Sequence, residues 1–126
     1  MSKIAPLHRP AAMTHRYIEI LHSRLCDAAA VYVQPGADRE AYLDGLAATI
    51  REHSCEPFQV SAEVTAPGFP DADIGTIQSG WCVAHDAGYW LVYQPERDRY
   101  CCFWGTDVTA LGAPGIYGEP LYCWSA

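Results

Sequence analysis

The spacing of apolar residues predicts two helices in the first half of the chain. From residue 13 to residue 32, apolar side chains recur at steps of three and four, the period of one helix face, at Met13, Tyr17, Leu21, Leu25, Ala28 and Tyr32. Gln34-Pro35-Gly36 ends this pattern. A second helix is predicted from Asp38, a favourable N-cap residue, to the region before Pro57. The short connection predicts that the two helices pack as antiparallel neighbours.

From Phe58 onward the period changes to two, which is typical of strands. Residues 58–66 alternate apolar and polar side chains, as a strand with one wet face does. Three further strands form a meander, with loops at residues 86–88 and 95–98. Residues 74–78 suit either a strand or a turn, residues 106–115 a loop, and residues 116–124 a last strand.

These elements predict an α+β fold in one domain. Two N-terminal antiparallel helices should pack on a curved antiparallel sheet of about five strands. The 126 residues suit a single domain over 1–126 that buries an ordinary core. Residues 1–12 are expected to be a loose lead-in, because Pro6 and Pro10 discourage a helix there.

Hairpin register determines which side chains share a face of the meander. A three-residue loop at 86–88 pairs His85 with Tyr89 and Trp81 with Tyr93, so one face is rich in Trp and Tyr. The opposite face has smaller side chains and suits packing against the helices; it carries Cys82, Ala84, Trp90, Val92, Cys101 and Phe103. Two alternatives remain open: the sheet curls and buries both faces, or a homodimer covers one of them.

The face rich in Trp and Tyr is the candidate partner-binding surface. Tyrosine and tryptophan combine a large apolar ring with a polar group, which suits them to wet interfaces. Three acidic residues form its rim. The candidate residues are Trp81, His85, Asp86, Tyr89, Tyr93, Glu96, Asp98, Tyr100 and Trp104.

Charge narrows the class of partner. The net charge is −7, and residues 58–126 carry eight acidic residues against only Arg97 and Arg99. Such a surface repels nucleic acid and anionic membranes and attracts a basic protein or a cationic ligand. The same charge also keeps a protein soluble, without any partner.

The six cysteines are expected to be reduced and mostly buried. The N-terminus lacks the apolar segment of a signal peptide, and no apolar run approaches the ~18 residues needed to span a membrane. These features favour a cytoplasmic protein.

Catalytic and metal chemistry finds little support. Cys82 and His85 lie three apart, which places them on opposite faces of a strand, so no metal site is expected. Cys102 and His85 are predicted to share the face rich in Trp and Tyr, but roughly 10 Å would separate them on strand spacing. Lys3 is the only lysine, which excludes a Schiff-base or phosphate-loop lysine in the folded body. No cofactor and no catalytic residue are therefore predicted.

In size, acidity, α+β character and absence of catalytic motifs, the chain resembles the small acidic immunity proteins of bacterial toxin–immunity systems. The resemblance covers overall character, so it assigns no residue a role. It implies a non-catalytic module that binds and neutralises a basic toxin domain. One alternative is a small-ligand-binding or hydrolytic domain with an aromatic-lined pocket, where His85, Asp86, Tyr89 or Asp107 would be polar groups. Another is a scaffold or dimerisation module.

Overall fold

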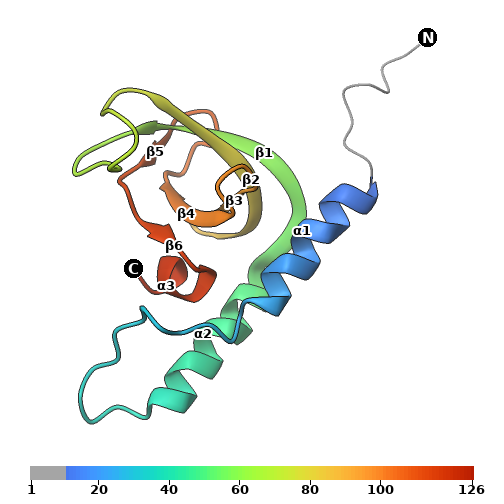
Figure 1. Cartoon of the computed structure of the whole chain (residues 1–126), viewed down its shortest axis with the longest axis vertical. Coiled ribbons are helices and arrows are strands. Elements are labelled where there is room, and N and C mark those ends of the chain that lie inside the picture. Colours follow the sequence, from blue (N-terminus) through green and yellow to red (C-terminus); the bar gives the residue numbers. More distant parts are fainter. Residues whose placement is uncertain (1–10) are drawn as a thin grey trace.

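The computed structural model describes residues 11–126, except for the side chains of residues 11–14. The elements, in chain order, are α1 (Ala11–Ser23), α2 (Arg39–His53), β1 (Ser54–Val64), β2 (Ile77–Asp86), β3 (Tyr89–Gln94), β4 (Arg99–Trp104), β5 (Leu111–Ala113), β6 (Tyr117–Gly118) and α3 (Pro120–Ser125) (Figure 1). The fold is α+β, as predicted. The expected lead-in lies outside the described residues, except that its last two positions, 11 and 12, belong to α1.

The sheet closes on itself. Strands β1 to β5 pair in sequence as antiparallel neighbours, and β5 then pairs in parallel with β1, through Ala62–Leu111 and Val64–Ala113. In an up-and-down series with an odd number of strands the first and last run in the same direction, so closure requires a parallel pair. The predicted antiparallel sheet is therefore confirmed only in part: the six strands form a mixed, mostly antiparallel sheet that curls into a small barrel (Figure 1).

Closure buries both faces of the meander. One face lines the barrel, with Cys82, Val92, Cys101 and Phe103 in its interior. The other face carries the large rings and packs beneath the helices, in a core formed by Tyr17, Leu21, Leu25, Val31, Ala47, Ile50, Trp81, Val83, Ala84, Leu91, Tyr93, Tyr100, Cys102, Leu121 and Cys123. The predicted assignment of faces was wrong: the face with Cys82, Val92, Cys101 and Phe103 lines the barrel, and the space under the helices holds the Trp and Tyr rings.

The second helix follows the prediction and the first does not. Asp38 caps α2 by accepting a hydrogen bond from the Ala41 N–H at 3.1 Å. However, α1 ends at Ser23, about ten residues early, because the chain then turns, with the Asp27 carboxylate accepting from the Ala29 N–H. The helices also lie end to end, α1 against β1 and α2 against β2 and α3, so they are not the antiparallel neighbours expected (Figure 1).

The two hairpins differ in how well their register was predicted. The β3–β4 pairs Tyr93–Tyr100 and Tyr89–Trp104 are those expected. The β2–β3 turn has two residues instead of three, and both have the positive φ that a type I′ turn needs. A bulge at Val83 absorbs the difference, so Trp81 still faces Tyr93 while His85 faces Trp90.

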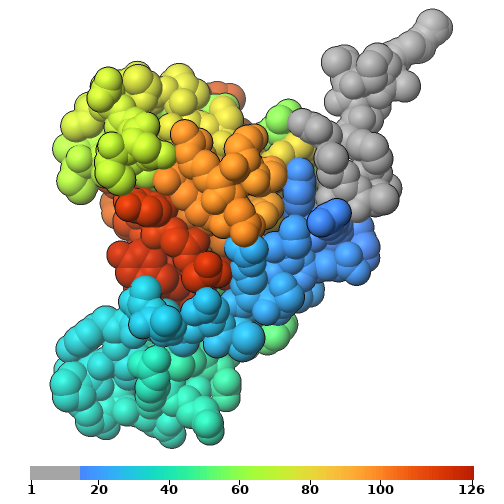
Figure 2. All heavy atoms as spheres, viewed as in Figure 1, coloured from blue at the N-terminus to red at the C-terminus, as the bar shows by residue number. Residues whose placement is uncertain are grey.

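The C-terminus ends in a helix, where a strand over residues 116–124 was expected. Pro120 occupies the first turn of α3, where its missing N–H costs nothing and its fixed φ suits the helix. Leu121 and Cys123 are buried in the helix-side core. The C-terminal segment fills the space between the barrel and the connection that follows α1 (Figure 2). None of the described helices is long and apolar enough to cross a membrane.

A glycine substitution tests the close packing of β2 on β3. A Cβ on Gly80 would lie 2.5 Å from Val92 Cγ1 and 2.8 Å from the Tyr93 carbonyl oxygen. Gly80→Ala should therefore lower the free energy of unfolding by roughly 1–3 kcal/mol, measured by urea denaturation. The matched control is Gly45→Ala in α2, where a Cβ meets nothing within 4 Å; it should raise stability by about 0.5–1 kcal/mol. Equal effects would contradict this packing.

Candidate functional site

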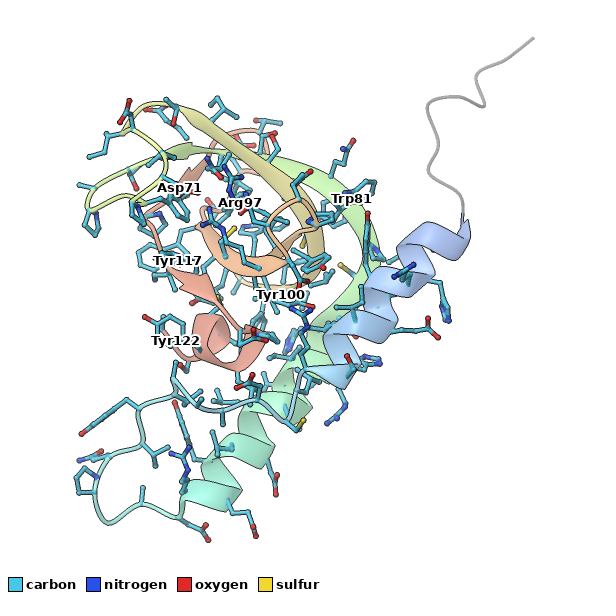
Figure 3. The ribbon with its side chains drawn as sticks, in the orientation of Figure 1. Asp71, Trp81, Arg97, Tyr100, Tyr117 and Tyr122 are labelled. Atoms are coloured by element: carbon cyan, nitrogen blue, oxygen red, sulfur yellow. The ribbon has the colours of Figure 1, made fainter. Side chains whose placement is uncertain are left out.

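Three of the nine predicted site residues lie in the core. Trp81, Tyr93 and Tyr100 are 7%, 4% and 0% exposed. The Tyr17 ring of α1 packs on both Trp81 and Tyr93, with centroids 5.5 Å apart in each pair. Trp81 lies next to α1 (Figure 3), and Tyr100 belongs to the same helix-side core. In the folded chain these three side chains are out of reach of a partner.

Asp98 joins the β3–β4 turn to the end of α1. Its carboxylate accepts two hydrogen bonds from Arg24, at 2.7 and 2.8 Å, and a third from the Tyr93 hydroxyl at 2.6 Å. The Arg24 hydrogen bond lowers the pKa of Asp98, and burial together with the Asp98 carboxylate raises the pKa of Tyr93 to about 12. This predicted rim residue therefore has a structural role.

Two other predicted residues, Asp86 and Tyr89, meet at a small cavity of about 210 Å³ between α2 and α3. The cavity is also lined by Thr49, Trp124 and Ala126. His53 approaches Asp86 at 3.5 Å, and the Trp124 ring lies between His53 and Tyr89. Trp104, 43% exposed, packs on the other side of Tyr89.

The polar groups around this cavity already have partners. The Tyr89 hydroxyl hydrogen-bonds to the carbonyl oxygens of Cys123 and Ala126, and burial raises its pKa. His53 Nδ1 lies 3.0 Å from the Thr49 carbonyl oxygen. Ligand pockets usually enclose about 300–1,000 Å³, so this cavity is small for a substrate, and its polar groups hold α3 in place.

His85 and Cys102 do not form the thiol–imidazole pair considered from the sequence. His85 stacks on Trp90 at 4.8 Å, on the barrel-lining side, whereas Cys102 lies in the helix-side core against Tyr89. The prediction that both share one face was wrong, because the Val83 bulge reverses the side to which His85 points. Burial raises the pKa of Cys101 to about 12. All six cysteines are free, and four of them are buried. Within the described residues no His, Cys, Asp and Glu cluster is suited to a metal ion.

A longer groove runs beside β1, at residues absent from the predicted site. It consists of two cavities of about 480 and 360 Å³ that share Ser61 and Thr109. The first is lined by Phe58, Gln59, Val60, Ser61, Ser79, Val108 and Thr109; the second by Ser61, Ala62, Glu63, Ile77, Thr109, Ala110 and Leu111. The alternation of residues 58–66 identified the wet face of β1. The groove also needs residues 108–111, which lie beside β1 only because the barrel closes.

In the barrel half of the chain, residues 54–118 from β1 to β6, both arginines form ion pairs. Arg97 and Arg99 both pair with Asp71, at 2.9 and 3.4 Å; Asp71 and Arg97 lie side by side (Figure 3). Arg99 also lies between the rings of Phe69 and Tyr117, with centroid distances of 5.1 and 4.9 Å. By contrast, several carboxylates are exposed and form no ion pair with the described part of the chain: Glu56, Glu63, Asp73, Glu96 and Asp107.

Two tryptophan substitutions test the revised assignment of faces. Trp81→Ala removes a ring buried beneath α1, so it should lower the free energy of unfolding by about 3–5 kcal/mol. Trp104→Ala, which truncates a partly exposed ring, should cost no more than half as much. Thermal or urea denaturation measures both. A Trp81→Ala variant as stable as the wild type would show that this face lies at the surface and not in the core.

The acid stability of the fold tests the Asp98 contacts. Because the folded pKa of Asp98 is lowered, its contribution is present above the unfolded value of about 3.9 and is lost as the pH falls through the folded value. Asp98→Asn should be less stable than the wild type at neutral pH. The difference should shrink as the pH falls below about 4, as followed by denaturation at several pH values. A constant difference would exclude this ionic contribution.

Comparison with known proteins assigns no family and no function to the chain. No family model, no curated protein and no solved structure matches the chain.

Proposed function

We propose that the chain is a non-catalytic protein-binding module of the immunity type, which binds a basic toxin domain and neutralises it. The observation that carries this proposal is the charge arrangement of the barrel half. Its two arginines are both engaged with Asp71, while Glu56, Glu63, Asp73, Glu96 and Asp107 face solvent. A surface of this kind attracts cationic partners.

Each exposed carboxylate contributes little alone, about 1 kcal/mol for a contact at 4 Å in water. Together, carboxylates of one sign accelerate association with a basic protein and discriminate against acidic ones. The apolar part of the contact would come from side chains that are still accessible, including Ile77, Trp104 and Val108, which are 62%, 43% and 44% exposed. The buried Trp81, Tyr93 and Tyr100 do not serve as anchors in this proposal.

The small-ligand and hydrolytic alternative has weaker support. The cavity at the residues predicted for it, beside Asp86 and Tyr89, is small, and its hydroxyl and imidazole groups already bind carbonyl oxygens. Asp107, the other proposed polar group, binds the N–H and hydroxyl of Thr109 in its own loop. These contacts leave binding of a macromolecule as the better proposal.

The test is capture of the partner followed by titration. The full chain is immobilised and exposed to lysate of its own cells, at low salt and at about 0.15 M, where charges more than about 8 Å apart are screened. We expect one basic protein to be retained stoichiometrically and more weakly at the higher salt. One equivalent of the chain should then abolish the toxic activity of that protein. A retained protein whose activity is unchanged, or no basic protein at either salt, would contradict the proposal.

Matched charge variants refine this test. Glu63→Gln with Asp107→Asn removes two charges from the barrel half, and Glu40→Gln with Asp44→Asn removes two from α2. The barrel pair should weaken binding of the captured protein about tenfold, equivalent to about 1.4 kcal/mol, and the α2 pair less. The reverse order would move the interface to the helix.

A further inference from the structure

We propose that the basic partner inserts an extended segment as an additional strand on the open edge of β1, beside the groove at Gln59 and Ser61. This inference rests on the proposed function and identifies the chemistry of the contact. Three observations carry it: the direction of the β1 backbone groups, the groove beside them, and the charge around that groove.

The backbone N–H and C=O groups of β1 point alternately toward its two neighbouring strands, β2 and β5. At its end, the Val64 N–H bonds to the Thr76 carbonyl oxygen at 2.8 Å, on the β2 side, and the Thr65 N–H bonds to the Ala113 carbonyl oxygen at 3.0 Å, on the β5 side. The direction alternates at each residue of a strand. The register with β2 is unbroken from Phe58 to Glu63, so the N–H and C=O groups of Gln59 and Ser61 point to the β5 side.

On that side the N–H and C=O of Gln59 and the N–H of Ser61 have no strand partner. The β5 strand begins with Leu111 opposite Ala62, and this parallel pairing directs the Leu111 N–H to the Ser61 carbonyl oxygen, so the described strands leave only the groups before it unpaired. The edge therefore offers two donors, at Gln59 and Ser61, and one acceptor, at Gln59, to which an extended segment can add.

The groove beside this edge can receive the side chains of an added strand. Phe58 and Val108 supply apolar walls in the larger cavity, and Ile77 supplies one in the adjoining cavity. Between them, the Ser61 and Ser79 hydroxyls lie 2.9 Å apart and provide polar contacts. Alternating apolar and polar side chains on the incoming strand would match this surface.

Charge identifies the occupant as a basic segment of another protein. Glu63 lines the groove, Asp107 precedes the loop that forms its wall, and Glu56 lies just before Phe58 in the sequence. Among the described residues, no basic side chain lines either cavity. A second copy of this chain paired at the edge would bring like charges together, which is unfavourable. Pro57, which lacks an N–H, keeps any pairing at this edge short, whichever segment adds there.

Backbone hydrogen exchange with a synthetic probe tests the proposal independently of any captured partner. The probe is a capped peptide of alternating lysine and valine, about six residues long, the usual length of a strand. At a saturating concentration it should slow exchange of the Gln59 and Ser61 amides about tenfold. A peptide of alternating glutamate and valine is the matched control and should leave both amides fast.

Two substitutions at one position separate the backbone from the side chain. Ser61→Pro removes the edge N–H and should abolish the slowing at Gln59 with little change in Tm, because this N–H faces away from β2. Ser61→Ala removes the same hydroxyl but keeps the N–H, so it should retain the slowing. If Ser61→Pro fails to fold, exchange of the wild-type amides still decides the question.

Several results would overturn the proposal. Slowing at other amides only, or none with the basic peptide, would show that the edge does not accept a strand. If the Gln59 and Ser61 amides exchange slowly in the free chain and become fast when residues 1–10 are deleted, the occupant of the edge is a segment of this chain and not a partner. A captured basic protein that leaves both amides fast would refute the edge while sustaining the proposed function. Slowing by the basic peptide, with no basic protein captured from lysate, would support the edge and contradict the proposed function.

Discussion

The structure depends on one constraint: a meander with two apolar faces must bury both of them. An open antiparallel sheet leaves one face to water, and this one carries large rings on one side and Cys, Val and Phe on the other. Curling the strands into a ring places the smaller face inside and turns the larger one toward the helices. Because the ring has five strands, its first and last strands run in the same direction, and the ring is closed by the parallel pairing of β1 with β5.

That closure also determines where the surface remains incomplete. The closing strand β5 spans only Leu111–Ala113, so it covers only the last part of β1. The remaining edge, at Gln59 and Ser61, lies open beside a groove whose other wall is the loop before β5. Arg97 and Arg99 both pair with Asp71, and none of the ion pairs among the described residues involves Glu56, Glu63 or Asp107. The candidate interface is thus a consequence of how the barrel closes.

Local signals predicted the local structure. The Asp38 cap, the alternation of residues 58–66 and the turn at residues 95–98 gave α2, the wet face of β1 and the β3–β4 register. Other features depend on contacts between distant residues. Three features depend on how the closed barrel packs, which a short stretch of sequence does not indicate: the end of α1 at Ser23, the Val83 bulge and the helix after Pro120. For the same reason, three predicted site residues proved to be core, and the β1 edge was missed.

The most direct test of this account is a set of long-range contacts between backbone protons, measured by NMR on the isotopically labelled full chain. The account predicts contacts between the β1 end and β5, at Glu63–Gly112 and Thr65–Ala113, since these residues close the ring. On the β5 side of Gln59 it predicts no contact to any strand. Contacts from Gln59 to a strand on that side, or none between β1 and β5, would contradict it.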